Sequence, residues 1–220
     1  MKIAVFGCSW SAGVPTLTDQ NGKILNWPYF LAKKTGWTVE NYALGGSCIK
    51  WSLNNLVSLL KEKKDYYTIF QVTNPYRLTY NKLEYSYKNF RDNVFDNYYQ
   101  YNATIRNFVL TYQAHYVNDK CWHKNNGIVV DKNILKMYET MIKYYPKEYF
   151  NNDYLSTINY IKTLSNLTFA HKKRLETNVL SIEDKFGEKF NKFCFDKGYH
   201  FNVEGLDYQA DFIKNLIDNT

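Results

Sequence analysis

Short apolar runs alternate with amphipathic segments over the first third of the chain. Residues 2–6, 38–43 and 66–72 are predicted to be strands, and the first of them runs directly into a glycine-containing turn. Residues 27–34 are predicted to be a helix, with a proline in its first turn and a glycine just after its end. Residues 52–63 carry an apolar stripe at helical spacing. Strand, helix, strand, helix, strand is the order typical of a parallel sheet flanked by helices.

The middle of the chain, about residues 80–165, differs in composition, because it is rich in Tyr, Asn and Lys and poor in small residues. Residues 133–145 and 154–164 are predicted to be helical, and 93–117 is a further helical candidate. Neither an internal repeat nor a Pro/Gly/Ser-rich linker separates this stretch from the rest. We therefore expect one domain, residues 1–220, with a mostly helical insertion or cap.

Strand and helix patterns return after the insertion. Residues 167–170 and 178–182 are predicted strands, and 205–217 is a predicted amphipathic helix. His171, followed by the basic run 172–174, is expected in a solvated turn. The expected fold is three-layered α/β, a parallel sheet flanked by helices, with a helical insertion.

Composition narrows the class of protein. Hydrophobic residues make up 45% and aromatic residues 18% of the 220 residues, enough to build a folded core. The net charge of +7 is scattered along the chain. Its densest cluster, Lys61, Lys63 and Lys64 with Glu62 inside it, is predicted to be a solvated helix face rather than a nucleic-acid site.

Cysteine usage and the chain's start bear on compartment and metal binding. The cysteines are Cys8, Cys48, Cys121 and Cys194. They lack Cys-x-x-Cys spacing, the start has no signal-peptide pattern, and no apolar run is long enough to span a membrane. Free thiols, synthesis in the cytoplasm and no membrane contact are expected. His115, Cys121 and His123 lie close together, but their spacing is not a standard zinc pattern, so no metal is predicted.

The turn after the first predicted strand contains a candidate nucleophile. Ser9 lies in Gly7-Cys8-Ser9-Trp10-Ser11-Ala12-Gly13, and groups at the carboxyl ends of parallel strands converge. A serine nucleophile needs a base within hydrogen-bond reach, an acid that orients the base, and donors for the oxyanion. The alternative is a phosphate-binding turn or simply a tight connection from strand to helix.

Two further loops follow the other predicted strands. A glycine in Gly45-Gly46 could offer its backbone N–H to a reaction centre, or the loop could be a plain connection. Thr73-Asn74 could supply a second oxyanion donor, or form an Asn-Pro turn with the next residue. Arg77 could bind an anionic group of a substrate or pair with a nearby carboxylate.

An acid and a histidine precede the last predicted helix. Asp196 could orient the imidazole of His200 while His200 takes the proton of Ser9. Alternatively, this segment is a surface loop in which an Asp or Asn caps the helix.

Taken together, these segments resemble the SGNH (GDSL-like) hydrolases over about residues 1–80 and 194–217. The Ser9 turn is similar to that family's first block, Gly-Asp-Ser-x-x-x-Gly, with Cys8 in place of Asp. The Val-Thr-Asn-Pro segment that ends in Asn74-Pro75 stands where the family has Gly-x-Asn-Asp. The last block, Asp-x-x-His, is one residue longer here.

The resemblance implies a flavodoxin-like fold and a serine esterase or O-deacylase that forms an acyl-enzyme without a cofactor. The implied site residues are Ser9 as nucleophile, His200 as base, Asp196 as the orienting acid, and Gly46 and Asn74 (or Thr73) as oxyanion donors. Arg77, from its own chemistry, is the candidate for substrate binding. The expected substrate is a small-molecule or glycan ester, for example an acetylated glycan.

The alternative is a catalytically inactive SGNH fold that serves as a structural or host-recognition module of a larger, virion-like assembly. Cys8, the altered third block and the longer last block motivate it, and the third block is similar to that of phage-encoded members. Geometry separates the two readings, because an active site requires the Ser9 hydroxyl within hydrogen-bond reach of His200 and a carboxylate on His200.

Overall fold

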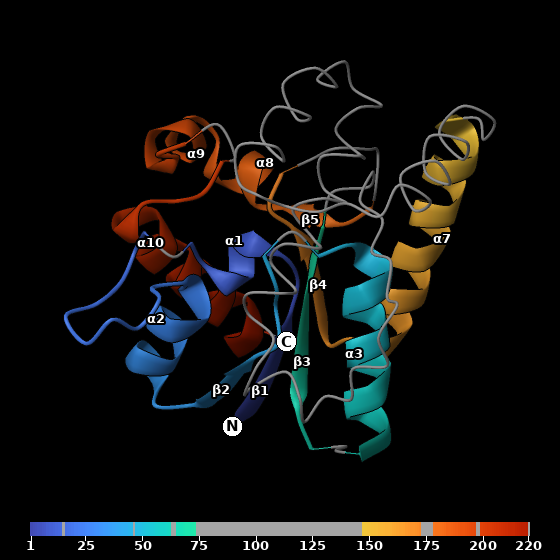
Figure 1. Ribbon diagram of the computed structural model, residues 1–220, viewed down its shortest axis with the longest axis horizontal. Helices are drawn as coiled ribbons and strands as arrows, with labels where there is room; N and C mark the ends of the chain where they lie inside the picture. The colour runs from blue at the N-terminus through green and yellow to red at the C-terminus, as the bar shows by residue number, and fades with distance from the viewer. Residues whose placement is uncertain are drawn as a thin grey trace, which may run out of the picture.

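A parallel sheet forms the centre of the protein (Figure 1). The computed structural model describes residues 1–14, 16–45, 47–62, 65–73, 147–172, 178–196 and 199–219. The strands of the sheet are β1 (Lys2–Phe6), β2 (Thr38–Asn41), β3 (Tyr67–Val72), β4 (Leu167–Ala170) and β5 (Leu180–Ser181). Their order is β2-β1-β3-β4-β5, and every neighbouring pair is parallel. This is the flavodoxin-like order, so the predicted fold class is confirmed.

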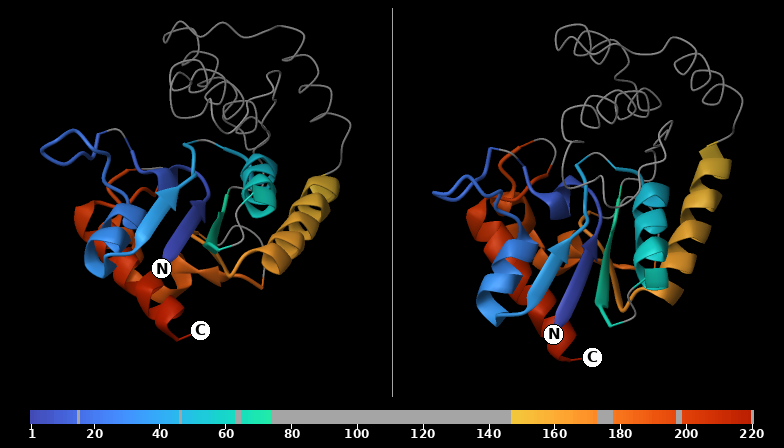
Figure 2. Two further views of the ribbon diagram at one scale, coloured as in Figure 1. Left: turned by 90° about the horizontal axis from the view of Figure 1, so that it is seen from below. Right: turned by 60° about the horizontal axis from the view of Figure 1, so that its bottom comes forward.

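Helices cover both faces of the sheet (Figure 2). The helices α2 (Trp27–Thr35) and α10 (Val203–Asp218) pack together on one face. The helices α3 (Ile49–Glu62) and α7 (Lys147–Leu164) pack together on the other. The sheet is therefore the middle of three layers.

Strand β1 shows how the sequence builds two cores. Ile3 and Val5 belong to the core that includes α2 and α10, whereas Ala4 and Phe6 belong to the core that includes α3 and α7. All four side chains are fully buried. A strand buried on both faces reads as a continuous apolar run, which is how residues 3–6 read in the sequence.

The boundaries of the elements differ from the predictions by a few residues. The helix predicted from residue 52 begins at Ile49, and the one predicted from residue 205 begins at Val203. That last start is set by Asn202, whose side-chain oxygen accepts a hydrogen bond from the backbone N–H of Gly205 at 2.8 Å. Two short helices, α8 (Ile182–Phe186) and α9 (Glu188–Phe193), were not predicted.

The last part of the 80–165 segment contains the helix predicted at residues 154–164. Helix α7, which lies within the expected 80–165 segment, is the crossover helix between β3 and β4. Tyr154, Ile158 and Ile161 on α7 are buried in the core beneath α3. Residues 147–164 are thus part of the three-layer fold, because two parallel neighbouring strands need such a crossover.

Several predictions fall outside the described residues. They are the helices at 93–117 and 133–145, the remainder of the insertion between residues 80 and 146, the His115, Cys121 and His123 group, and Lys63, Lys64, Lys173 and Arg174.

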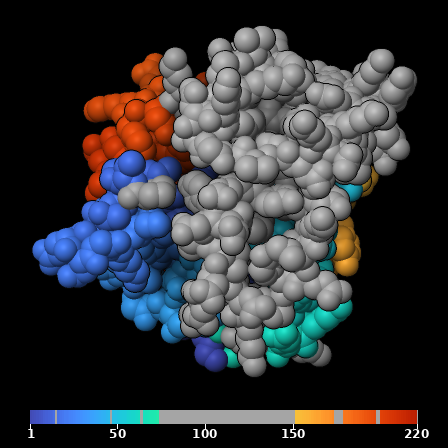
Figure 3. Space-filling view, viewed as in Figure 1, coloured from blue at the N-terminus to red at the C-terminus, as the bar shows by residue number. Residues whose placement is uncertain are grey.

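The C-terminal helix α10 packs against α2, so the end of the chain lies beside its N-terminal part. In the space-filling view the blue N-terminal segments and the orange and red C-terminal helices lie against each other on the left (Figure 3). Lys34 on α2 forms ion pairs with Asp207 at 2.9 Å and Asp211 at 2.7 Å on α10. Partly exposed pairs contribute little, so the buried side chains between the two helices carry the packing. Within the described ranges, no helix is long and apolar enough to cross a bilayer.

Candidate active site

Ser9 is the first residue of a short helix, α1 (Ser9–Ala12), which begins just beyond the carboxyl end of β1. The carbonyl of Cys8 accepts hydrogen bonds from the N–H groups of Ser11 and Ala12, at 2.9 and 2.8 Å. Ser9 is 8% exposed, so it is nearly buried and does not project from the protein surface. The predicted tight turn after the first strand is therefore present, with Ser9 at its tip.

Ser11 ties this turn to three neighbouring elements. Its hydroxyl accepts a hydrogen bond from the indole N–H of Trp27 at 3.1 Å and donates one to the side-chain carbonyl of Gln71 on β3. Its backbone carbonyl accepts a hydrogen bond from the side-chain amide of Asn41 at 2.8 Å. Ser11 and Gln71 are fully buried. The hydroxyl of Ser11 is therefore a structural group, and that of Ser9 is the one that faces the site.

Gly13 ends the turn in a conformation that only glycine adopts easily, with φ 86° and ψ 177°. A Cβ at this position would lie 2.6 Å from Cγ2 of Ile24 and 2.7 Å from the carbonyl oxygen of Leu25. We expect Gly13→Ala to lower the free energy of unfolding by about 1–3 kcal/mol for the backbone conformation and by about 1–3 kcal/mol more for the clash. Urea denaturation measures this loss.

Gly22 provides the matched control for that substitution. It also has a positive φ, 76°, but a Cβ there would meet no atom within 4 Å. Gly22→Ala should therefore show only the conformational loss. Equal losses at the two positions would show that the turn around Ser9 relaxes to accommodate a methyl group.

Asp196 and His200 lie on one loop between α9 and α10. The loop is closed by an antiparallel bridge between Cys194 and Phe201. Inside it, the N–H of Tyr199 donates to the carbonyl of Asp196 at 3.1 Å. Tyr199 has φ 60°, in the left-handed region, which costs a residue with a Cβ about 1–2 kcal/mol. The longer Asp-x-x-x-His spacing is therefore compatible with contact between the Asp196 and His200 side chains.

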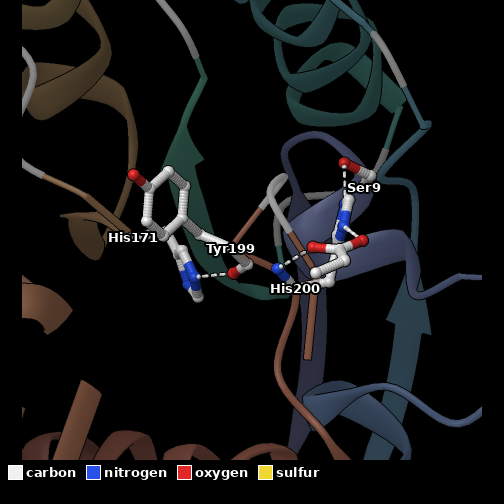
Figure 4. A network of polar contacts seen from close by, with 5 residues as sticks. Ser9, His171, Tyr199 and His200 are labelled. Atoms are coloured by element: carbon white, nitrogen blue, oxygen red, sulfur yellow. Dashed lines mark hydrogen bonds and ion pairs between the residues drawn. The ribbon is translucent and has the colours of Figure 1, made fainter. Parts of the chain in front are cut away.

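The structure brings Ser9, His200 and Asp196 together (Figure 4). Nε2 of His200 lies 2.9 Å from Oγ of Ser9, and Nδ1 lies 2.7 Å from Oδ2 of Asp196. The backbone N–H of His200 also donates to Oδ1 of Asp196 at 3.0 Å. A carboxylate can only accept, so Nδ1 carries the imidazole proton and Nε2 is free to accept the proton of Ser9. The His200 side chain is 12% exposed and the Asp196 side chain 37% exposed.

Cys194 lies two residues before Asp196, on the same loop. Burial raises the pKa of its thiol to about 11, and the negative charge of Asp196 acts in the same direction. At neutral pH the group is a thiol rather than a thiolate, and only a thiolate is a strong nucleophile. The loop therefore offers an imidazole and a carboxylate to the site, but no competing sulfur nucleophile.

The loop after β2 is held against the Ser9 turn by one carbonyl. The carbonyl of Gly7 accepts hydrogen bonds from the N–H of Leu44 at 3.1 Å, the hydroxyl of Ser47 at 2.9 Å and the hydroxyl of Ser52 at 3.3 Å. This arrangement brings both sides of the predicted Gly45-Gly46 donor next to the turn. Gly46 itself lies outside the described residues, and its role remains a prediction.

The end of β3 is described only as far as Thr73. Thr73 is buried, and its carbonyl accepts a hydrogen bond from the hydroxyl of Tyr154 at 2.5 Å. Its own hydroxyl is buried without a partner among the described residues. Asn74 and Arg77 lie outside the described residues, so their roles, like that of Thr73, remain predictions.

The prediction of a solvated turn at His171 is wrong. His171 directly follows β4, and it is only 1% exposed. Its imidazole stacks on Trp10 with ring centroids 4.7 Å apart, and Nε2 lies 2.7 Å from the carbonyl oxygen of Tyr199. The basic residues that follow His171 led to the prediction that it is exposed to solvent. The position after a parallel strand, where functional groups converge, was the signal that should have placed it near Ser9.

A hollow that is partly open to solvent lies beside Ser9 and His200. Most of its remaining lining among the described residues is apolar: Trp10, Gly13, Val14, Leu17, Phe201 and Leu206, together with His171. No cluster of three or more metal-binding side chains occurs in the part of the chain that the structure describes.

A hydroxyl, an imidazole and a carboxylate connected in this order are the arrangement of the Ser-His-Asp serine hydrolases, which occurs on several unrelated folds. The family model described as GDSL-like Lipase/Acylhydrolase matches residues 3–213, and the chain belongs to this family. Family membership indicates an enzyme that hydrolyses esters. None of the curated proteins compared with the chain matches it.

Proposed function

We propose that this protein is a serine esterase, an O-deacylase, in which Ser9 is the nucleophile, His200 the general base and Asp196 the acid that orients the base. One observation carries the proposal: the 2.9 Å contact between Ser9 Oγ and His200 Nε2, in a member of an acylhydrolase family. The 2.7 Å contact between Asp196 and Nδ1 supports it, because it fixes the tautomer that leaves Nε2 able to accept a proton.

The reaction divides into two halves. In the first, Ser9 Oγ attacks the carbonyl carbon of the ester while its proton passes to His200 Nε2. The tetrahedral intermediate then breaks its bond to the alcohol oxygen, and His200 returns the proton to the departing alcohol. In the second, a water molecule loses a proton to His200 and attacks the acyl carbon. The bond between that carbon and Ser9 Oγ then breaks, His200 returns the proton to Ser9 Oγ, and the acid is released. The only reactants are the ester and water, so no cofactor takes part.

The negative charge that develops on the carbonyl oxygen requires hydrogen-bond donors. The proposed donors are the backbone N–H groups of Ser9 and Gly46 and the side chain of Asn74, with Thr73 as the alternative to Asn74. Ser9 begins α1, and the first N–H groups of a helix have no partner within that helix. Removal of one such donor costs about 2.7–4 kcal/mol of transition-state stabilisation in a comparable enzyme.

The substrate that the site fits best is the ester of a short acyl group, such as the acetyl ester of a glycan. The hollow beside Ser9 and His200 supports this assignment, since its walls include Trp10, Val14 and Leu17 and a short acyl group has the apolar character to pack against them. Arg77 is proposed to bind an anionic group of the alcohol part.

A fluorophosphonate probe tests the proposal, because it reacts covalently with a serine that is activated by a neighbouring base. The wild-type protein is expected to be labelled, and Ser9→Ala and His200→Ala are expected to remain unlabelled although folded. Hydrolysis of p-nitrophenyl acetate should then exceed hydrolysis of the octanoate ester. A folded wild-type protein that is not labelled would rule out the esterase and leave the fold as a structural or recognition module.

A further inference from the structure

The loop that carries His200 contains an unfavourable backbone conformation immediately before the histidine. Tyr199 has φ 60°, which a residue with a Cβ rarely adopts. Such a conformation persists only where its surroundings hold it in place. The direction in which the His200 side chain leaves the backbone depends on it, because the two residues share the peptide bond formed by the carbonyl of Tyr199.

That carbonyl is held by a residue from another part of the fold. His171, at the exit of β4, places Nε2 2.7 Å from the carbonyl oxygen of Tyr199 (Figure 4). A carbonyl oxygen can only accept, so Nε2 carries the proton of His171 and donates it. His171 and His200 thus use opposite ring nitrogens as donors, Nε2 in the first and Nδ1 in the second.

The imidazole of His171 also contacts the residues next to both Ser9 and His200. Its ring centroid lies 4.7 Å from that of Trp10, which follows Ser9, and 4.5 Å from that of Phe201, which follows His200. Its backbone carbonyl accepts a hydrogen bond from the N–H of Glu183 at 3.1 Å, which ties it to the start of α8. One buried side chain therefore connects the Ser9 turn with the His200 loop.

A second residue just after β4 contacts the side chain of Tyr199. Nζ of Lys172, the residue after His171, lies 3.3 Å from the centroid of the Tyr199 ring, which is a cation–π contact. Lys172 is also 3.4 Å from a carboxylate oxygen of Glu183. His171 holds the backbone of Tyr199 and Lys172 holds its ring, so both contacts fix the same residue.

We propose that His171 is a positioning residue: by donating a hydrogen bond to the carbonyl of Tyr199, it orients the imidazole of His200 between Asp196 and Ser9. This inference rests on the proposed function. His171 does not touch the reacting atoms in this scheme and exchanges no proton with the substrate. It sets the geometry of the group that does, and misplacement of a catalytic group by about 1 Å can cost about 100-fold in rate.

The test compares three replacements of His171. In His171→Gln, the amide nitrogen can occupy the position of Nε2 and donate to the same carbonyl. In His171→Asn the amide is one methylene too short, and in His171→Leu there is no donor. We expect kcat for p-nitrophenyl acetate to fall about 10–100-fold in the Leu and Asn variants with KM within about threefold, and the Gln variant to recover to within about fivefold of wild type. Thermal melting confirms that each variant is folded.

Nuclear magnetic resonance supplies a readout that does not depend on activity. Nitrogen shifts of the wild-type protein should show His171 protonated on Nε2, and a low-field proton on Nδ1 of His200 should mark its bond to Asp196. That low-field signal should persist in His171→Gln and broaden or vanish in His171→Asn.

Two results would overturn the inference while leaving the esterase intact: a wild-type His171 without a proton on Nε2, or a Gln variant no more active than the Asn variant. Absence of fluorophosphonate labelling in wild type would instead overturn the proposed function. The readouts therefore distinguish the two failures.

Discussion

Replacement of Ser9 by alanine is expected to lower kcat for a short-chain ester by about 10⁴–10⁶-fold, the range found when a serine nucleophile is removed from a comparable site. The physical reason is that Ser9 Oγ is the hydroxyl in contact with Nε2 of His200, at 2.9 Å. The fold should be unaffected, because the change removes only one oxygen at the edge of the hollow. Steady-state kinetics with p-nitrophenyl acetate measures the loss.

Ser11 is the matched control in the same turn. Its hydroxyl accepts from Trp27 and donates to Gln71, so Ser11→Ala removes hydrogen bonds in the interior rather than the nucleophile. It should lower the free energy of unfolding by about 1–3 kcal/mol, since a buried partner is left unsatisfied. Its kcat should stay within about tenfold of wild type. A Ser11→Ala variant as inactive as Ser9→Ala would mean that activity follows the integrity of the turn and not the Ser9 hydroxyl.

The second large effect is expected at the acid. Asp196→Asn should lower kcat about 10²–10⁴-fold with KM little changed, because an amide at this position can hold His200 in the wrong tautomer. The range extends below the roughly 10⁴-fold loss known for a buried aspartate, since the Asp196 side chain is 37% exposed and water can take over part of its role. Rates measured across the pH range should stay low at every pH.

A surface aspartate controls for the change in charge. Asp207 on α10 pairs with Lys34 at 2.9 Å and is not among the residues that line the hollow. Asp207→Asn changes the net charge by the same amount. Its kcat should match that of wild type. If Asp196→Asn were as active as Asp207→Asn, then His200 would be oriented by its other contacts and the carboxylate would have no part in catalysis.

The layers of the fold could be predicted because each central strand is a local signal. Residues 3–6 are apolar on both faces, and the turn that follows begins with Gly7, so strand and boundary are both visible in a short stretch of sequence. The helices α8 and α9 give no such signal. They span Ile182–Phe186 and Glu188–Phe193, which is too short to display a helical period, and they exist because Phe186, Phe190 and Phe193 pack into the core.

The site was only partly predictable for a related reason. Asp196 and His200 are only four residues apart, so their contact is local. The motif predicted this contact, although it did not explain why the two residues are one position further apart than in the family pattern. Neither the hydrogen bond between Tyr199 and Asp196 nor the left-handed conformation of Tyr199 can be read from the count of residues.

The environment of His171 depends on contacts between distant parts of the chain. Trp10 comes from α1, Phe190 from α9 and Phe201 from the loop before α10, so no window around His171 contains them. The residues next to His171 in the sequence are Lys172 and its basic neighbours, and they led to the prediction of a solvent-exposed turn. Lys172 is in fact 19% exposed, and its charge lies over the ring of Tyr199.

The distribution of these contacts along the chain gives the active site an uneven dependence on folding. The bond between Asp196 and His200 lies within a single bridged loop, whereas the one between His200 and Ser9 joins residues 191 positions apart. The contact between the acid and the base is therefore made within one loop, whereas the contact with Ser9 requires that loop to be packed against the start of the chain. Because local opening requires less free energy than global unfolding, we expect the contact between His200 and Ser9 to be lost more readily than the contact between Asp196 and His200.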